Sequence, residues 1–295
     1  MDNFIILEDL YQTHLSKISK VRNKKTKSIT VLKQILQKNQ DDSPSKETLR
    51  EVLVLMNFSH PNIVKYHSVF VHKMNIVLEM EFCATTLSSI LSKMSKPFHL
   101  GQTKKILRSI GEGLKYLHDN DIMHRDVKPG NILINENCEI KLGDFGSSRI
   151  ITPDIKAVTA GIGTKWYKAP EIIFGRKDYD KKVDIWSFGC LAAELFLLEP
   201  IFPGNTDFEM ISSIIALLGF SKEDEDVMNP QIRLQLVESK ENFFDCLLDC
   251  ADSDFISMLK KMLMINFNKR YTIDEVLADK FFSSDKDYMN VNLPI

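Results

Sequence analysis

The first part of the chain contains short segments in which apolar and polar residues alternate, which is the pattern of a β-strand. In residues 28–33 the alternation places Ile29, Val31 and Lys33 on one face of such a strand. The same kind of pattern, with one basic turn, predicts strands within residues 10–35, 62–70 and 74–82. We therefore expect a small sheet at the start of the chain.

Helical spacing dominates the rest of the chain. Ser43 and Pro44 offer a cap and a first-turn residue before the apolar positions of residues 49–56, which predicts one helix inside the strand-rich part. Residues 106–117 have the apolar stripe of an amphipathic helix, and residues 183–198 are apolar all round, as in a buried central helix. The pattern predicts an α+β fold of two unequal lobes, a small β-rich lobe with one main helix and a larger, mainly helical lobe.

Composition narrows the class of protein. A chain of 295 residues can build one large domain or two lobes, and its net charge of -2 provides no field for binding nucleic acid. The five cysteines are odd in number and scattered, so we expect no disulfide framework and an intracellular protein, nuclear or cytoplasmic. No apolar run is long enough for a signal peptide or a membrane span, so we expect no membrane partner.

Two polar loops between short apolar strands carry the candidate chemistry. Residues 122–134 contain Asp126, Lys128 and Asn131, and residues 140–149 contain Asp144. A single aspartate in a loop is usually a turn or cap residue. Phosphoryl transfer, however, needs a carboxylate at the acceptor hydroxyl, a cation on the transferring charge and oxygen ligands for magnesium. Together these loops supply all three.

These loops resemble the signature motifs of eukaryotic protein kinases. Residues 124–126, 144–146 and 169–171 read HRD, DFG and APE, and the resemblance extends from about residue 4 to residue 282. It is closest to the cyclin-dependent kinases of the CMGC group. The resemblance implies a bilobal protein kinase fold, with an N-lobe in residues 1–82 and a C-lobe in residues 83–295. It also implies ATP and Mg²⁺ as cofactors.

The resemblance assigns roles in catalysis and metal binding. Asp126 orients the acceptor hydroxyl, and Lys128 steadies the transferring phosphate. Asn131 and Asp144 hold magnesium. Lys128, Thr164 and the WYKAPE stretch resemble serine/threonine kinases rather than tyrosine kinases, so Thr164 is counted with the catalytic residues.

The resemblance also assigns a nucleotide site and several supporting residues. Lys33 pairs with the nucleotide phosphates, and Glu51 orients Lys33. Asp184 is expected to cap the catalytic loop, and Glu171 to form a structural ion pair with Arg270. The implied adenine pocket is made by Ile18, Val31, Met80, Glu81, Cys83 and Leu133, with Met80 as gatekeeper and the backbones of Glu81 and Cys83 facing adenine.

One feature departs from the kinase pattern. All 12 glycines lie at or after Gly101, and the glycine positions of the phosphate loop fall on Tyr11, Thr13 and Ser16. Glycine lets backbone amides approach phosphate closely, and losing two hydrogen bonds at about 0.5–1.5 kcal/mol each weakens binding roughly 10- to 100-fold. The catalytic carboxylate and metal ligands are all present. The sequence therefore favours an active enzyme over the alternative, a pseudokinase or weakly active scaffold that binds partners.

Control by phosphorylation is a further expectation. Thr159 lies at the register where cyclin-dependent kinases carry their activating phosphothreonine. Arg50, Arg125 and Arg149 come from three different segments, so one phosphate could tie these segments together. We therefore predict that these three arginines bind the phosphate group of phosphorylated Thr159.

The partners stay open at this level. Residues 45–52 partly resemble the cyclin-contacting helix, which predicts a cyclin-like subunit in cell-cycle or transcription control. The glycine-free loop and residues 161–175 also resemble single-subunit fungal kinases that activate cyclin-dependent kinases, which would need no cyclin. Gly163 makes a proline-directed protein substrate a further expectation. A small-molecule phosphotransferase is a third class, less favoured because residues 164–171 resemble a platform for peptide substrates.

Overall fold

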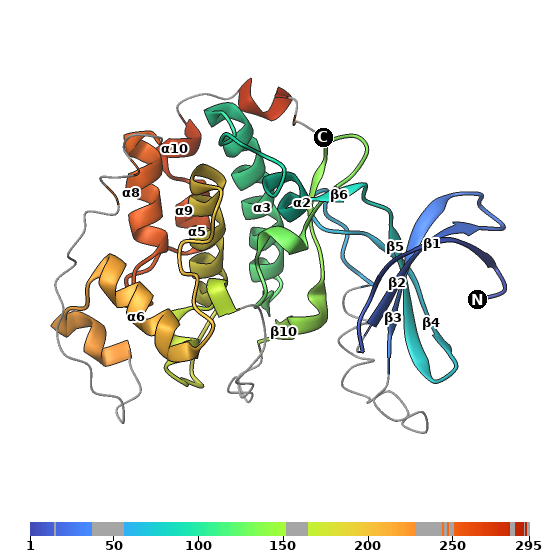
Figure 1. Cartoon of the computed structure of the whole chain (residues 1–295), viewed down its shortest axis with the longest axis horizontal. Coiled ribbons are helices and arrows are strands. Elements are labelled where there is room, and N and C mark those ends of the chain that lie inside the picture. Colours follow the sequence, from blue (N-terminus) through green and yellow to red (C-terminus); the bar gives the residue numbers. More distant parts are fainter. Residues whose placement is uncertain are drawn as a thin grey trace. The chain divides into compact units, whose positions relative to one another are not determined.

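The computed structural model describes residues 1–14, 16–36, 56–151, 165–227, 251–283 and 287–291, together with Phe244, Leu247 and Leu293. The chain forms two compact units (Figure 1). The first consists of Met1–Ala84 and Leu133–Gly143, and the second of Thr85–Ile132 and Asp144–Ile295. The expected division into residues 1–82 and 83–295 has a single boundary. The observed units differ from it, because residues 133–143 belong to the first unit.

An antiparallel sheet of five strands, in the order β1-β2-β3-β5-β4, forms most of the first unit. Its central strand β3 is buried on both faces, since neighbouring Thr30, Val31 and Leu32 are all buried. Val21, Leu32 and Val77 make a small core on which Phe4 and Phe70 pack. The strands are β1 (Phe4–Gln12), β2 (Ser16–Asn23), β3 (Ile29–Ile35), β4 (Tyr66–His72) and β5 (Asn75–Glu81). The predicted small sheet is confirmed.

The hairpin of β8 (Ile132–Ile134) and β9 (Ile140–Leu142) brings a later segment to the first unit. β9 is fixed there by its backbone, because Leu142 donates to the carbonyl of Asn62 at 2.9 Å and accepts from the N–H of Val64 at 2.9 Å. Two of the predicted elements are not found as predicted in the described residues. The predicted strand of residues 62–70 begins only at Tyr66, and the predicted helix of residues 43–56 lies outside the described residues except for Met56.

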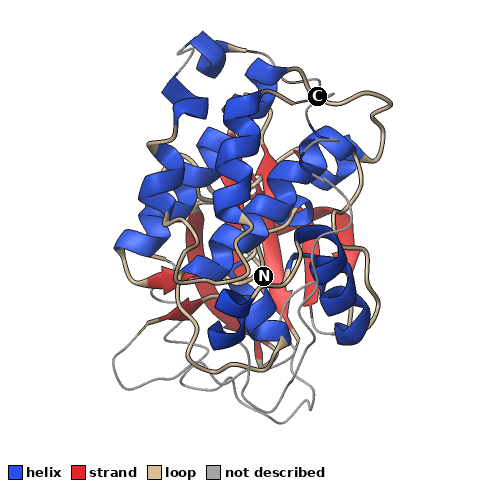
Figure 2. Cartoon of the chain, turned by 90° about the vertical axis from the view of Figure 1, so that its left-hand side faces the viewer, coloured by secondary structure: helices blue, strands red, loops and turns tan. Residues whose placement is uncertain are grey.

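The second unit is mainly helical (Figure 2). Its helices include α2 (Leu87–Leu91), α3 (Leu100–Asp119), α4 (Pro170–Ile173), α5 (Lys182–Leu197), α6 (Asp207–Leu218), α8 (Ser253–Met262), α9 (Ile273–Leu277) and α10 (Lys280–Ser283). Short 3₁₀ turns lie at η1 (Pro129–Asn131), η2 (Phe145–Ser147), η3 (Lys165–Tyr167), η4 (Lys222–Val227) and η5 (Asp287–Asn290). The short strands are β6 (Thr85–Thr86), β7 (Ile122–Met123) and β10 (Arg149–Ile150).

Helix α5 is the core of the second unit, as its apolar sequence predicted. Every residue from Val183 to Phe196 is buried. Trp186 stacks on Phe202 with ring centroids 5.7 Å apart, and Phe196 packs on Phe255 of α8 at 4.3 Å. A side chain that projects from α5 is therefore held firmly on all sides, which makes this helix a rigid base for the loops around it.

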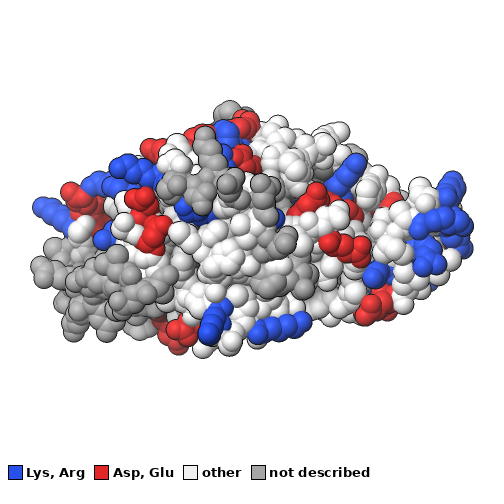
Figure 3. Space-filling view, turned by 90° about the horizontal axis from the view of Figure 1, so that it is seen from above, with Lys and Arg blue, Asp and Glu red and all other residues white. Residues whose placement is uncertain are grey.

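The surface carries charges of both signs. Figure 3 shows basic and acidic side chains near one another over the face that it displays, and no single sign covers that face. This agrees with the small net charge of -2. Within the described residues, no helix combines the length and the apolar character that crossing a lipid bilayer requires.

Candidate active site

One buried carboxylate fixes the loop that follows β7. Asp184 lies in the first turn of α5 and is fully buried. Its Oδ1 accepts the backbone N–H of Arg125 at 2.7 Å, and its Oδ2 accepts the backbone N–H of His124 at 2.8 Å. The Nε2 of His118 donates to the same Oδ2 at 2.9 Å. The predicted cap of Asp184 on the catalytic loop is thereby confirmed. His118 is a further hydrogen-bond partner of Asp184 that the sequence did not predict.

The same contacts set the charge of Asp184. Burial alone raises the pKa of this carboxyl, but the hydrogen bond from His118, the charges of His118 and His124 and the backbone N–H of Arg125 outweigh it. The pKa of Asp184 therefore lies below its ordinary value of 3.8, and the carboxylate is ionised at neutral pH. An ionised acceptor holds the loop more strongly than a neutral one would.

Within the second unit, residues 124–125 of the first predicted loop contact residues 145–147 of the second. Arg125 has a left-handed backbone with φ of 65°, and its Nε donates to the carbonyl of Ser147 at 2.7 Å. The ring of His124 meets that of Phe145 edge-on at 5.2 Å. A non-glycine residue with positive φ costs free energy, so the surrounding contacts must hold Arg125 in this conformation.

Asp126, Lys128 and Asn131 form one hydrogen-bonded group. The Nζ of Lys128 lies 2.8 Å from Asp126 Oδ2, and the Nδ2 of Asn131 donates to the same oxygen at 2.8 Å and to the Asp126 carbonyl at 2.7 Å. The Asp126 side chain is 11% exposed. The carboxylate is thus fixed in orientation, next to an ammonium group, at a place that solvent still reaches. This arrangement can bind a hydroxyl and stabilise negative charge beside it.

The residues predicted to bind magnesium suit that ion. Asn131 uses its amide nitrogen to contact Asp126, which leaves its amide oxygen for another partner. Asp144 has a left-handed backbone with φ of 55°, and its Oδ1 accepts the N–H of Gly146 at 3.3 Å. Both offer the hard oxygen donors that Mg²⁺ prefers, and Mg²⁺ usually takes only one or two carboxylates besides water and phosphate. Across the part of the chain that the structure describes, no cluster of three or more His, Cys, Asp or Glu forms a full protein cage.

Helix α5 also holds the segment from Lys165 onward. Ser187 donates to the Tyr167 carbonyl at 2.7 Å, and the Tyr167 hydroxyl donates to Glu194 at 2.6 Å. Burial and the nearby Glu194 charge raise the pKa of Tyr167, so its hydroxyl keeps the proton that it donates. The predicted ion pair of Glu171 with Arg270 is confirmed, with both side chains buried and a two-pronged contact at 2.7 and 2.9 Å.

Four predicted nucleotide-site residues share one face of the sheet in the first unit. Ile18 lies opposite Lys33, and Val31 lies opposite Met80. Opposed residues of antiparallel strands project to the same side, and Val31 and Lys33 are two positions apart on β3. The sheet therefore brings all four together. Their predicted role toward a nucleotide stays a prediction.

Glu81, Cys83 and Leu133 are the other three residues of the predicted adenine pocket, and they also belong to the first unit. Glu81 Oε1 accepts the N–H of Lys65 at 2.7 Å and lies 3.3 Å from the buried Nζ of Lys141, which also donates to the Pro61 carbonyl at 3.0 Å. Sequence reasoning missed Lys141, although a lysine inside the apolar stretch IKLG could have drawn attention to it. Burial, followed by the Glu81 charge, raises the pKa of the Cys83 thiol to about 12, so this thiol stays protonated.

The side chain of Leu133 explains why residue 143, directly before Asp144, is a glycine. A Cβ atom at Gly143 would lie 2.8 Å from Leu133 Cδ1 and 3.1 Å from the Val64 side chain. Real Cβ atoms do not approach so closely, so only glycine fits here without a shift of its neighbours.

The glycine-free hairpin closes with side chains. The N–H of Thr13 donates to the Ser16 carbonyl at 2.8 Å, and Thr13 Oγ1 accepts the Ser16 N–H at 3.1 Å. Asp9 on β1 binds Lys17 at 2.7 Å and Ser19 at 2.7 Å on β2. The turn is thus stabilised by its own polar groups at two of the positions where the kinase pattern has glycine.

Several predicted residues fall outside the described residues, namely Glu51, Arg50, Thr159 and Thr164. Of the predicted phosphate receptors, Arg125 is held by Ser147 and by the Tyr179 hydroxyl at 3.3 Å. Arg149 lies on β10 opposite Met123 of β7, one residue before His124. Their role as receptors stays a prediction.

Comparison with known proteins gives one family match and several similar cyclin-dependent kinases. Residues 6–282 match the protein kinase domain family. Cyclin-dependent kinase D-1 of Arabidopsis thaliana is 32% identical over 287 residues, which cover 96% of this chain and 72% of that protein. Cyclin-dependent kinase 20 of Pongo abelii is 32% identical over 295 residues, which cover 96% and 83%. Cyclin-dependent kinase G-2 of Oryza sativa subsp. indica is 36% identical over 225 residues, which cover 76% of this chain but 32% of that protein.

The substitution Asp184→Asn tests the buried carboxylate. We expect it to lower the free energy of unfolding at pH 7 by roughly 1.5–3 kcal/mol, because asparagine has only one acceptor oxygen: one of the two backbone N–H groups loses its acceptor, and the other binds a neutral acceptor in place of a charged one. Since the folded pKa of Asp184 lies below the unfolded value, this contribution is fully present above the unfolded pKa and is lost as the pH falls through the folded pKa. Urea unfolding curves from about pH 7 down to about pH 3 should therefore show the difference between the two proteins shrinking only below about pH 4.

The matched control is Asp254→Asn, a half-buried aspartate in the first turn of α8. It should change stability by no more than about 0.5 kcal/mol. An equal loss in both variants would show that the contacts of Asp184 carry no special weight.

Proposed function

Because the chain belongs to the protein kinase family and is cyclin-dependent-kinase-like along most of its length, we propose that it transfers the γ-phosphate of ATP to serine or threonine side chains of proteins. The observation that carries this proposal is the group of Asp126, Lys128 and Asn131, held together by hydrogen bonds and fixed on Asp184. A buried ionised carboxylate is stable only when it is hydrogen-bonded, and here its hydrogen bonds fix the backbone of the loop that carries Asp126.

Each residue of the group has a task in the proposed reaction. Asp126 accepts a hydrogen bond from the acceptor hydroxyl and orients its oxygen toward the phosphorus. Lys128, with its ammonium 2.8 Å from Asp126, stabilises negative charge on the transferring group. Asn131 and Asp144 hold magnesium, which neutralises charge on the phosphate oxygens when it is bound with ATP. Since the groups are positioned before substrate arrives, little reorganisation is needed during transfer.

The sheet of the first unit supports the nucleotide part of the proposal. Lys33 shares a face with three apolar residues, Ile18, Val31 and Met80, so an apolar surface lies next to a cation. Such a surface suits a molecule with a flat apolar ring and a charged phosphate tail. We assign the adenine to the apolar residues and the phosphates to Lys33.

The protein substrate and the regulatory partner are also part of this proposal. Lys128 and the Lys165 to Glu171 segment, which α5 holds, support serine or threonine on a peptide as the acceptor. The names of the relatives describe cyclin-dependent kinases, which supports a cyclin-like subunit. The alternative is a kinase that acts alone on the activation segment of another kinase. Adding candidate cyclins to the purified chain separates the two, because only the first should respond.

The variants Asp126→Asn and Asp144→Asn test the proposed chemistry. We expect each to lower kcat for peptide phosphorylation at least about 100-fold, since each removes a group that stabilises the transition state rather than the bound substrate. The assay follows radiolabelled phosphate from magnesium-ATP to a serine/threonine peptide library, with Asp254→Asn as the control. Well-folded protein with no turnover, with and without cyclins, would contradict the proposal and favour a scaffold.

The glycine-free loop gives a second prediction. Replacing Tyr11, Thr13 and Ser16 together by glycine should lower the KM for ATP by about tenfold, because backbone amides could then approach the phosphates. The value of kcat should change less than the KM, since this contact stabilises bound ATP and transition state alike. Steady-state kinetics over a range of ATP concentrations measure both. An unchanged or higher KM would show that the Thr13 and Ser16 side chains do not weaken ATP binding.

Control by phosphorylation is proposed on the same basis. A phosphate on Thr159 would bind Arg125 and Arg149, two arginines of the second unit that flank the catalytic loop. Compared with unsubstituted protein that mass spectrometry shows to be phosphorylated at Thr159, Thr159→Ala should then have at least about tenfold lower activity, while Thr159→Glu restores part of it. Full activity of Thr159→Ala removes this mode of control.

A further inference from the structure

The outer strand β1 exposes more apolar surface than the rest of the sheet in the first unit. It lies at one end of the strand order and is paired with β2 alone. Every residue from Ile5 to Gln12 is exposed, and the side chains of Ile5, Ile6 and Leu7 are 47%, 51% and 43% exposed. Apolar surface of this kind gains free energy when a partner covers it.

The backbone of β1 is open along its outer edge. Alternate residues of an edge strand direct their N–H and C=O groups away from the sheet, and proteins often protect such an edge with lysine or proline. Residues 4–12 contain neither. Residues 4–6 keep a regular register with residues 21–23 of β2, and the irregularities of the pairing begin only after Ile6. The start of β1 can therefore pair with one more strand.

The end of β2 and the turn to β3 place positive charge beside this part of β1. The basic turn, as we name it, consists of four exposed side chains, Arg22, Lys24, Lys25 and Lys27. Arg22 lies opposite Ile5, and the N–H of Lys24 donates to the Asn3 carbonyl at 2.8 Å. Asn23 Oδ1 fixes the turn by accepting the N–H groups of Lys25 at 3.0 Å and Thr26 at 3.3 Å. Figure 3 shows Lys and Arg side chains gathered at its right-hand end, which is part of the first unit.

The charges of the basic turn have no counter-ion within the chain. None of its four side chains forms an ion pair with a described residue. Of the acids on β1, Asp9 binds Lys17 at 2.7 Å, and Glu8 lies opposite Lys20. Asp2 is exposed nearby in the sequence, and four cations less this one carboxylate leave three positive charges. The basic turn therefore attracts an acidic group from outside the chain.

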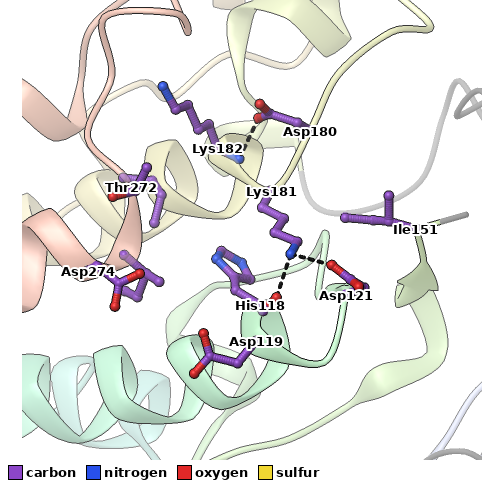
Figure 4. Close-up of a pocket in the computed structure, with 11 residues that line it drawn as sticks. His118, Asp119, Asp121, Ile151, Asp180, Lys181, Lys182, Thr272 and Asp274 are labelled. Atoms are coloured by element: carbon purple, nitrogen blue, oxygen red, sulfur yellow. Dashed lines mark hydrogen bonds and ion pairs between the residues drawn. The ribbon is translucent and has the colours of Figure 1, made fainter. Parts of the chain in front are cut away.

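Lysines elsewhere in the molecule are balanced. A cavity of about 440 Å³ lies where the end of α3 and the starts of α5 and α9 meet, and three isoleucines, four aspartates and two lysines are among the residues that line it (Figure 4). Lys181 of this cavity binds Asp121 at 2.7 Å. Next to it, Lys115 binds Asp274 at 2.5 Å and Asp119 at 3.2 Å. These two lysines have carboxylate partners within the chain, in contrast to the lysines of the basic turn.

We propose that the start of β1 and the basic turn bind an extended segment of a partner protein in which aliphatic residues are followed by Asp or Glu. The segment pairs with residues 3–7 as a sixth strand of the sheet, and its aliphatic side chains cover Ile5, Ile6 and Leu7. In antiparallel pairing its C-terminal end reaches the basic turn, so the acidic residues follow the aliphatic ones. A segment that ends in Lys or Arg is repelled there.

Two other occupants fit these features less well. A second copy of the chain that pairs through the same regular residues, 3–6, brings two basic turns close to each other, and like charges repel. An anionic lipid surface satisfies the cations but offers no strand to the open backbone groups of β1. A peptide segment satisfies the backbone, the apolar side chains and the charges together.

The test uses labelled peptides and the whole protein. One set has alternating Val or Ile residues followed by two Glu residues, and its matched set has Lys in place of each Glu. Fluorescence anisotropy should show that the Glu set binds at least about tenfold more tightly, and that raising the salt concentration weakens this binding. The assay needs no ATP, so its result is independent of the proposed phosphate transfer.

Peptide methylation tests the strand pairing. Glu peptides are made with every second backbone N–H methylated, in the two possible frames. The frame that faces β1 should lose at least about tenfold in affinity, because its N–H groups can no longer donate to the edge, whereas the other frame keeps its affinity.

Variants of the basic turn locate the acidic end of the segment. Replacing Lys24, Lys25 and Lys27 together by Gln should weaken binding of the Glu set about five- to tenfold and reduce its salt dependence. The control removes the same charge from three exposed lysines of the second unit, with the substitutions Lys93→Gln, Lys96→Gln and Lys222→Gln, and should leave binding unchanged.

Variants of β1 locate the apolar part. Ile5→Thr combined with Leu7→Thr keeps β-branched, strand-forming residues and removes apolar surface, so it should weaken binding at least about fivefold. The control is Val71→Thr on β4, the other edge strand, where the side chain is 56% exposed. Thermal melting of each variant confirms that it is folded.

Hydrogen exchange supplies the direct readout. With the Glu peptides bound, amides of residues 3–7 that point away from β2 should exchange at least about tenfold more slowly. The proposal is overturned if their exchange does not change, if the Lys set binds as tightly as the Glu set, or if the control lysine variant weakens binding as much as the basic-turn variant.

The other occupants have outcomes of their own. If light scattering shows a dimer of the chain alone that Ile5→Thr with Leu7→Thr dissociates, the edge belongs to a second copy and the proposal is overturned. It is equally overturned if phosphatidylserine vesicles bind the protein through the basic turn while the Glu set does not bind.

Discussion

The charge on Asp184 is the constraint from which the arrangement of the second unit follows. This carboxylate is fully buried, so it is stable there only because His118 and two backbone N–H groups donate to it. Those two N–H groups belong to His124 and Arg125, directly before Asp126. The free energy of satisfying a buried charge is thereby used to fix the backbone of a loop whose Arg125 has an unfavourable positive φ.

Helix α5 connects this loop to a second segment. Besides Asp184, it carries Ser187 and Glu194, which bind the carbonyl and the hydroxyl of Tyr167. Arg270 adds a further connection, since it binds Glu171 of α4 and also donates to the Lys182 carbonyl at 2.9 Å. A helix that is buried from Val183 to Phe196 therefore holds the loop before Asp126 and the residue 165–171 segment in one rigid frame, which is the precision that the proposed phosphate transfer needs.

The hairpin of the first unit illustrates why not every departure from a family pattern has the same weight. Thr13 and Ser16 close their turn with hydrogen bonds where glycines would leave backbone amides open. A weaker contact with a nucleotide can be offset by a higher nucleotide concentration, whereas a lost transition-state contact cannot. The chain lacks glycine at the predicted phosphate-loop positions, whereas Asp126, Lys128, Asn131 and Asp144, which we propose to act in phosphate transfer, are all present.

The sequence by itself determined the elements and the identity of the chemical groups. Alternation predicted the strands of the first sheet, continuous apolar character predicted α5, and the two polar loops indicated phosphoryl transfer before any coordinates. These signals are local, since they depend on side-chain periods of two or 3.6 residues and on residues close in the chain. The boundaries were less well determined, and β4 begins at Tyr66 rather than at residue 62 because the backbone of residues 62–64 binds β9 instead.

Only the tertiary structure decided which distant groups meet. His118 reaches Asp184 across 66 residues of sequence, and Lys141 reaches the Pro61 carbonyl across 80. No local period encodes such a contact, because it depends on how whole elements pack. The cavity between α3, α5 and α9 is of the same kind: its isoleucines are ordinary core residues in the sequence, and its aspartates are ordinary surface residues. They meet only because three element ends pack around one space, where two of the carboxylates share the ammonium of Lys115.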